Sequence, residues 1–549
     1  MSDAADGAMA GVPLREALPL RLDPTGVPHL DDLLGGGLPR GALTLVVGPP
    51  GSGKTTLAVQ MACAAARAGR KVLILTAFSE PVTKLITHLR TLRFFTDGLL
   101  GNCLQVLSLT QFLPRGLEAT ASEIRDLVRH GQYSLVVLDG FHSVRGADTA
   151  EHAARRFLYE VGSAADMLQA TVVITSEAAP RDARLYPEAT TADVLLGLQY
   201  ALAGLREARF LEVIKARGLA KLPGLHTLTL GAEGVVVYPR LEARVAPLTG
   251  DVGDDADGAA ADETTVALHA LRQRAPFGLP EMDMLLDGGL TRETSTILVG
   301  SPGAGKTLLA LHWVLAGTDA GEPAVYLGFR ENRRQLLLSA DTFGLGAALR
   351  TALAPGGLLS FVRLAPVELD PDVLADLLLS ALERTGARRL VIDSIGELER
   401  AVAEGSASTR IPGYIAGLIE ALRARAVTTL AIREGTHLVA DGLVVATDPL
   451  AVLAENVLVL QNVTLGDRLH RVFSAPKMRF SAHDLRVREV RIAPPHGMRV
   501  LAPLESAPGV FARIAARAGA TSDDRGEPAP PGAKDTEYGG RDADPYRGR

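Results

Sequence analysis

Short runs of apolar residues recur along the chain and alternate with longer segments of mixed polarity. The runs at 71–78, 134–140 and 171–176 are dominated by Val, Leu and Ile, a composition typical of strands that are buried on both faces. The segments between such runs are long enough for helices. This alternation predicts an α/β fold in which a mainly parallel sheet is flanked by helices.

The chain contains an internal duplication. Residues 25–60 recur as 277–312, matching in residue type and spacing through a short amphipathic helix, a Gly-Gly-Leu turn, an apolar strand, a glycine-rich loop and a helix. Residues 251–265 are acidic and small, and the chain beyond about residue 514 has little to bury, as in linkers and disordered tails. We therefore expect a flexible tail (1–15), a first domain (16–245), an acidic linker (246–270), a second domain (271–510) and a disordered tail (511–549).

Composition favours a folded, cytoplasmic protein. At 549 residues the chain exceeds what one core usually supports, and 47% of its residues are hydrophobic. No segment approaches the ~18–20 apolar residues of a membrane span, and the N-terminus does not resemble a signal peptide. Cys63 and Cys103 are too few for a disulfide framework and are interpreted as small core residues. A formal net charge of −6 gives no general attraction to nucleic acid.

Two glycine-rich loops match the phosphate-binding pattern G-x-x-x-x-G-K-[ST], each between an apolar strand and a helix. Such a loop turns backbone N–H groups toward phosphate oxygens, and its Lys adds a compact positive charge. Only eight of the 57 basic residues are Lys, and each loop has one. The alternative, a glycine-rich turn before a surface helix, does not explain two matches in register. The predicted ATP-binding residues are Gly48, Pro49, Pro50, Gly51, Ser52, Gly53, Lys54, Thr55 and Thr56, and Gly300, Ser301, Pro302, Gly303, Ala304, Gly305, Lys306, Thr307 and Leu308.

Each loop also needs a partner for Mg²⁺. Thr55 and Thr307 carry the loop hydroxyls that can bind the ion. Asp139 and Asp393 end apolar strands downstream in the same half, where a carboxylate would hold the ion or its bound water. Strands also end in Asp because of turn chemistry alone. The loop upstream in each half favours the metal interpretation.

With both halves assembled, the chain resembles the KaiC branch of the RecA superfamily, a group of double-domain ATPases. The resemblance covers roughly residues 20–245 and 270–500. It implies two tandem RecA-like P-loop NTPase domains, each with a late antiparallel β-hairpin. Its most specific residues close each half, as Ile214-Lys215-Ala216-Arg217-Gly218 and Pro476-Lys477-Met478-Arg479.

In this family the Lys-x-Arg pair reaches the γ-phosphate bound by an adjacent subunit. The resemblance therefore implies a catalytic contribution in trans from Lys215, Arg217, Lys477 and Arg479, and a ring, by analogy a hexamer, with ATP at the subunit boundaries. Alternation along a strand would place both cations of a pair on one side. The alternative is a pair of basic residues on an exposed strand face.

The chain departs from the family after the second strand of each half. Family members have two consecutive Glu there, the first thought to polarise the attacking water, whereas this chain has Ser79-Glu80 and Arg330-Glu331. Glu80 and Glu331 are candidates to take over that role, or they support the following helix. We therefore expect ATP binding more firmly than rapid hydrolysis. The candidate catalytic residues for hydrolysis are Glu80 and Glu331, together with Lys54 and Lys306.

Three functions remain open. The first is a KaiC-like ATPase in which ATP and Mg²⁺ switch a ring that a regulatory protein partner reads, as a conformational switch or signalling scaffold. The second is a Ser/Thr autokinase, although Ala451-Val452 replaces the family's phosphorylated Ser-Thr pair and leaves only residues such as Thr447. The third is a recombinase-type DNA-binding ATPase, which the 4% aromatic content and the lack of a basic, aromatic-containing loop disfavour.

Overall fold

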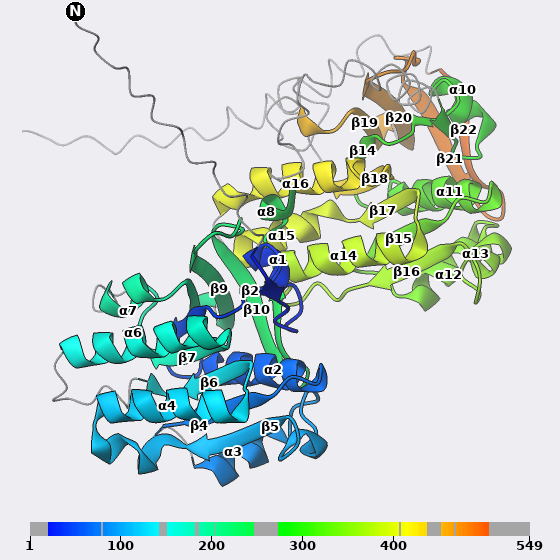
Figure 1. Cartoon of the computed structure of the whole chain (residues 1–549). Helices are drawn as coiled ribbons and strands as arrows, with labels where there is room; N and C mark the ends of the chain where they lie inside the picture. The colour runs from blue at the N-terminus through cyan, green and yellow to red at the C-terminus, as the bar shows by residue number, and fades with distance from the viewer. Residues whose placement is uncertain are drawn as a thin grey trace, which may run out of the picture.

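The computed structural model describes residues 20–77, 81–141, 151–181, 186–203, 205–245, 273–405, 408–435, 452–465 and 468–503. The expected linker and both expected tails lie outside these ranges, as do Glu80, Thr447 and Ala451. Each half of the described chain forms a nine-stranded sheet covered by helices (Figure 1). The expected α/β fold with two tandem RecA-like domains is confirmed.

In the first half, six parallel strands lie in the order β8-β3-β7-β6-β4-β5, and three antiparallel strands extend the sheet as β11-β10-β9 beside β8. The late hairpin is thus β8–β9. The strands are β3 (Leu43–Gly48), β4 (Val72–Thr76), β5 (Leu104–Ser108), β6 (Leu135–Asp139), β7 (Thr171–Glu177), β8 (Val194–Ala203), β9 (Arg206–Ala216), β10 (Leu225–Gly231) and β11 (Gly234–Tyr238).

The second half repeats this topology. Its order is β16-β15-β17-β18-β14-β19-β20-β21-β22, in which β14 plays the part of β3 and β19–β20 forms the hairpin. The strands are β14 (Ser295–Gly300), β15 (Ala324–Gly328), β16 (Leu359–Arg363), β17 (Arg389–Asp393), β18 (Thr428–Glu434), β19 (Asn456–Leu465), β20 (Arg468–Met478), β21 (Arg488–Ala493) and β22 (Gly497–Pro503). Two-stranded ribbons precede the sheets, formed by β1 (Leu22–Asp23) with β2 (Leu38–Pro39) and by β12 (Arg274–Ala275) with β13 (Leu290–Thr291).

Helices pack on both faces of each sheet because every central strand is apolar on both sides. In β3, Val46 lies on the face of the sheet that α2 and α3 cover, whereas Leu45 and Val47 lie on the face that α4 and α6 cover. The helices of the first half are α1 (Leu30–Leu34), α2 (Lys54–Arg67), α3 (Val82–Leu89), α4 (Leu117–Gly131), α6 (Glu151–Leu168), α7 (Tyr186–Thr191) and α8 (Leu241–Val245). Those of the second are α10 (Pro280–Leu285), α11 (Lys306–Asp319), α12 (Arg333–Thr342), α13 (Gly346–Ala352), α14 (Pro371–Thr385), α15 (Ile395–Gly405) and α16 (Ile411–Arg423).

The two halves are joined through α8, which lies beside α16 (Figure 1). Leu241 and Val245 of α8 belong to the hydrophobic core of the second half. The Leu241 N–H donates to Asp372 Oδ1 at 3.2 Å, and Arg410 bridges Glu242 and Asp372 at 2.8 and 2.6 Å. The C-terminus of the first domain is therefore anchored on the N-terminus of α14.

Both cysteines are free, as expected of small core residues. Cys63 is buried in α2, and burial raises the pKa of its thiol to about 12. Cys103 is half-buried against the same core. Within the described ranges, no helix has the length and apolar character needed to cross a bilayer.

Candidate nucleotide-binding sites

The two glycine-rich loops have the same backbone conformation. Each connects the central strand, β3 or β14, to the helix that follows, and the two helices begin at Lys54 and Lys306. The glycine before each Lys has a left-handed φ, 98° at Gly53 and 103° at Gly305, which other residues rarely adopt. The sequence prediction that these segments form strand–loop–helix units is therefore correct in both halves.

Each loop Lys folds back onto its own loop. Lys54 Nζ donates to Pro49 O at 2.9 Å, and Lys306 Nζ donates to Gly300 O and Ser301 O at 2.8 Å each. Burial lowers the pKa of both side chains, and nearby carboxylates oppose that shift. A buried ammonium that is held only by carbonyl oxygens is well placed to exchange them for phosphate oxygens.

Another loop side chain lacks a partner altogether. The hydroxyl of Ser52 is buried without a hydrogen bond to any described residue, a costly arrangement unless a ligand supplies the missing partner. This unsatisfied donor inside the first loop fits a phosphate oxygen.

The structure brings the predicted Mg²⁺ residues together in both halves. Thr55 Oγ1 donates to Asp139 Oδ1 at 2.9 Å, and Thr307 Oγ1 donates to Asp393 Oδ2 at 2.8 Å. Among the described residues no group of three or more His, Cys, Asp or Glu side chains could hold a metal ion. One hydroxyl and one carboxylate, completed by phosphate oxygens and water, are the hard oxygen donors that Mg²⁺ requires.

Sequence reasoning missed the residues that orient these two carboxylates, and they differ between the halves. Asp139 accepts a hydrogen bond of 2.6 Å from Thr175 on the neighbouring strand β7. Asp393 instead accepts one of 2.8 Å from Tyr326, a fully buried residue on the neighbouring strand β15. Within an apolar strand a Tyr or Thr resembles an ordinary core residue, so the sequence carries no signal for this role.

The Lys-x-Arg pairs lie at the opposite edge of each sheet from the glycine-rich loops. Lys215 is paired with Leu195 near the start of β8, and its Nζ donates to Ala189 O and Thr190 O, which precede that strand. Because β8 runs parallel to β3, the loop after Gly48 lies at the other end of these strands. The four residue-to-residue steps from Thr44 to Gly48 span about 13 Å.

The second pair is placed in the same way. Lys477 is paired with Val457 at the start of β19, and its Nζ donates to Ala454 O at 2.7 Å. The strands end one residue before each Arg, at Ala216 and Met478, but the backbone pairing continues, since the Arg217 N–H donates to Asp193 O at 3.0 Å and the Arg479 N–H to Glu455 O at 3.2 Å. The Arg217 side chain donates to Thr190 O at 2.8 Å, the carbonyl that Lys215 also contacts, so both cations of the first pair lie on one side, as the alternation predicts.

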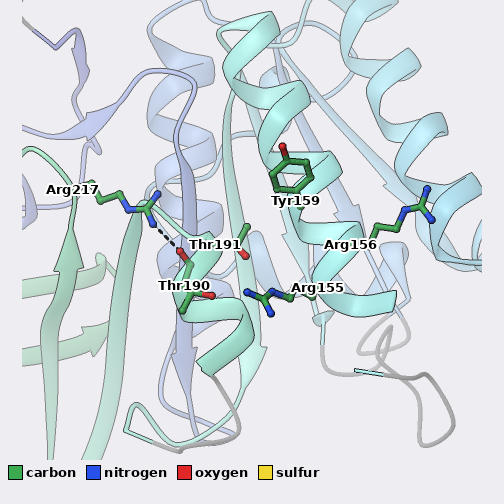
Figure 2. A pocket seen from close by; sticks show the side chains of 6 residues that line it. All are labelled: Arg155, Arg156, Tyr159, Thr190, Thr191 and Arg217. Carbon is green, nitrogen blue, oxygen red and sulfur yellow. Dashed lines mark hydrogen bonds between the residues drawn. The ribbon is translucent and has the colours of Figure 1, made fainter. Parts of the chain in front are cut away.

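Beside Arg217 an open basic pocket enters the surface of the first half. It is lined by Arg155, Arg156, Tyr159, Thr190, Thr191 and Arg217. Figure 2 shows the Arg155 side chain extending toward the two threonines, whereas Arg156 points away from them. Arg156 is paired with Glu118 and Glu160 at 2.8 and 3.0 Å, and Arg155 has no hydrogen bond or ion pair with any described residue. Arg217 is itself paired with Asp193 at 3.2 Å, so Arg155 is the guanidinium of this pocket that the described residues leave without a counter-ion.

The family's two consecutive Glu positions can be assessed only in the second half, since Ser79 and Glu80 lie outside the described residues. Partial burial of the Glu331 carboxyl, together with the negative charge of Asp393, raises its pKa. It does not cap the following helix, because Asn332 and Gln335 form a capping box there. Glu331 therefore remains a candidate to act near Asp393.

Arg330 makes a cluster that the sequence analysis did not foresee. Its guanidinium donates to Glu434 Oε1 at 2.8 Å and to Glu397 Oε1 at 3.3 Å. Glu434 ends β18 directly beside Gly300 of the loop strand. The only available signal was that both 171–177 and 428–434 end in Glu.

Comparisons with known proteins agree with this geometry. A family model described as the KaiC ATPase matches residues 23–242 and 275–505. The chain belongs to the KaiC family of ATPases. It is 23% identical over 479 residues to the circadian clock oscillator protein KaiC of Prochlorococcus marinus (strain MIT 9313), covering 85% of this chain and 90% of that one. It is also 23% identical over 485 residues to the circadian clock oscillator protein KaiC 1 of Synechocystis sp. (strain ATCC 27184 / PCC 6803 / Kazusa), covering 85% and 87%.

Proposed function

We propose that this KaiC-family chain binds ATP with Mg²⁺ in both halves and hydrolyses it slowly. Assembly into a ring, hexameric by analogy with the family, would place each nucleotide between neighbouring copies. The ring would act as a nucleotide-dependent conformational switch or signalling scaffold, read by a protein partner. ATP bound at a boundary stabilises the assembled state by mass action, so nucleotide occupancy sets the population of that state.

The observation that carries the ring proposal is the position of the Lys-x-Arg pairs. Lys215 and Lys477 lie at the amino ends of the parallel strands, and the glycine-rich loops lie at the carboxyl ends. A pair at one edge cannot serve the loop of its own domain at the other edge. If these cations contact a phosphate bound in a glycine-rich loop, that loop belongs to another copy of the chain.

Within one site, the chain's own groups have separate tasks. Backbone N–H groups of the loop and Lys54 would bind the triphosphate, and Thr55 and Asp139 would hold Mg²⁺. The ion, when bound, neutralises charge on the β- and γ-phosphates. Arg217 of the adjacent copy would stabilise the charge that develops on the leaving phosphates. The second half repeats these tasks with Lys306, Thr307, Asp393 and Arg479.

The test is sizing of the full chain with and without ATP and Mg²⁺, combined with phosphate release. Lys54→Ala and Lys306→Ala, made separately, should each weaken assembly or turnover, whereas the exposed Lys71→Ala should leave both unchanged. A chain that fails to retain labelled ATP at millimolar Mg²⁺, or loop variants that assemble and turn over normally, would contradict the proposal.

Mixing of variants tests action in trans. One chain lacks both loop lysines, as Lys54→Ala with Lys306→Ala. The other lacks the arginine of both Lys-x-Arg pairs, as Arg217→Gln with Arg479→Gln. Each chain alone should be nearly inactive. A mixture should regain part of the phosphate release, because some subunit boundaries then combine an intact loop Lys with an intact Arg from the neighbouring copy. The absence of any recovery would argue against a shared site.

A further inference from the structure

Each glycine-rich loop has a glutamate beside it that has not been assigned a role. Glu177 ends β7 in register with Gly48, and Glu434 ends β18 in register with Gly300. Both carboxylates are exposed at the carboxyl edge of the sheet, the edge to which the loop and the Mg²⁺ residues belong. The negative charge of each reaches the ammonium of the loop Lys in its own half.

The charge around these two carboxylates differs. Glu434 accepts from Arg330 at 2.8 Å, and Arg330 also contacts Glu397, whose side chain is only 3% exposed and which is paired with Arg400 at 3.0 Å. The result is a compact cluster of two cations and two anions. A carboxylate held by a guanidinium has less freedom to turn toward a water molecule, and part of its negative charge is neutralised.

At the positions equivalent to Arg330, Glu397 and Arg400, the sequence of the first half has no charged residue. The repeat places Ser79 opposite Arg330 and Ser143 opposite Glu397. Neither serine carries a charge. Glu177 itself has no hydrogen bond or ion pair with any residue that the structure describes, so its charge remains available at the edge of the site.

Building on the proposed function, we infer that Glu177 orients the attacking water in the first half, and that Arg330 withdraws the equivalent Glu434 so that the second half stores ATP. In the first half the water oxygen bonds to the γ-phosphorus while the bond from that phosphorus to the β–γ bridging oxygen breaks. Glu177 accepts a proton from the water and passes it to the released phosphate, leaving ADP and inorganic phosphate. In the second half, Arg330 adds a positive charge close to Lys306.

Two single-site backgrounds test the inference in the full chain. With Lys306→Ala, only the first site binds; adding Glu177→Gln should lower its phosphate release by about 100-fold while labelled ATP stays bound. With Lys54→Ala, only the second site binds; adding Arg330→Ser should raise its phosphate release by about tenfold. Arg334→Ser is the matched control, since Arg334 is an exposed residue of α12 without an ion pair among the described residues.

A second readout does not depend on turnover. Wild-type chain incubated with ATP and then denatured should release ATP from the second site and ADP from the first, and Arg330→Ser should shift the released nucleotide toward ADP. Unchanged hydrolysis in Glu177→Gln, or an unchanged ATP-to-ADP ratio in Arg330→Ser, would overturn the inference while leaving ATP binding intact. If the wild-type chain retains no nucleotide, the proposed function itself fails, so the two failures are distinguishable.

Discussion

The two halves have the same side chains at the positions where a nucleotide would contact the protein. The residues that support those side chains differ between the halves. Loop Lys, loop Thr and strand-ending Asp are equivalent in both, with Thr-to-Asp hydrogen bonds of 2.9 and 2.8 Å. Behind them, Thr175 supports one Asp and Tyr326 the other. The two halves thus share the same candidate nucleotide-binding groups while the residues that support them differ, which leaves room for the two sites to differ in rate and stability.

A further difference between the halves lies at the first residue of β6 and of the equivalent strand β17. The first residue of β6 is Leu135, and the equivalent residue of β17 is Arg389, which is 0% exposed. Arg389 donates to Glu322 Oε2 at 2.6 Å and to Trp313 O at 2.7 Å, and its guanidinium lies 5.0 Å from the centre of the Trp313 ring. A buried ion pair therefore occupies the position in the second half where the first half has a buried leucine.

The first prediction breaks this contrast. Arg389→Ala should lower the free energy of unfolding of the second half by about 3–5 kcal/mol, because it leaves the backbone carbonyls of Pro276 and Trp313 without their buried donor and leaves Glu322 with Arg292 as its remaining cation. Trp313 is the chain's single tryptophan, so its fluorescence during denaturation reports on this half. Leu135→Ala is the control and should leave the Trp313 transition nearly unchanged. An unaltered midpoint in Arg389→Ala would show that the cluster contributes little.

The second prediction separates the two metal supports. Tyr326→Phe removes the hydroxyl that orients Asp393, and Thr175→Val removes the one that orients Asp139. Each should raise the Mg²⁺ concentration needed for half-maximal ATP retention by about tenfold, the usual loss of metal affinity when a residue that orients a metal ligand is removed. The effect should be confined to the altered half, as Mg²⁺ titrations in the Lys54→Ala and Lys306→Ala backgrounds would show. Equal effects on both sites would mean that the supports act on the fold instead.

The sequence was sufficient for the features that depend on local pattern. The repeated loops, the apolar strands and the two aspartates follow from spacing alone, and the structure places each Thr beside its Asp.

Contacts between distant segments could not be derived. Arg330 meets Glu397 and Glu434 from 67 and 104 residues away in the chain, and nothing near Arg330 in the sequence indicates either partner. The anchoring of α8 on the second half has the same origin. Its short apolar pattern predicts burial without saying in which core.

The third prediction concerns the basic pocket of the first half (Figure 2). Arg155→Gln removes a cation that no described residue pairs with and that lines the same pocket as Arg217, so assembly should need about two- to fivefold more ATP, as expected for an exposed charge. Arg156→Gln is a matched control from the next position, because Arg156 already pairs with Glu118 and Glu160. Sizing across an ATP titration measures the difference. Identical behaviour of the two variants would separate the pocket from the subunit boundary.

The smallest expected effect lies where the halves meet. His29 Nε2 lies 3.6 Å from Asp376 Oδ2, and Arg244 Nη1 lies 2.9 Å from Asp376 Oδ1. The contact with the Asp376 carboxylate raises the pKa of His29 above its usual value, with burial opposing the shift. Burial of Asp376 works against ionisation, but His29 and Arg244 outweigh it and lower the pKa of that carboxyl.

Because the pKa of His29 is raised on folding, its stabilising contribution is full below about pH 6.5 and is lost as the pH rises through the folded-state pKa. The wild-type chain should therefore lose at most about 1 kcal/mol of stability between about pH 6 and pH 8.5 from this contact. His29→Asn, which tolerates the left-handed backbone at this position (φ 60°), should abolish that component. His88→Asn on the exposed face of α3 should not. Denaturation midpoints at the two pH values measure the difference, and an equal pH response in His29→Asn and wild type would mean that the contact between the halves is insensitive to this histidine.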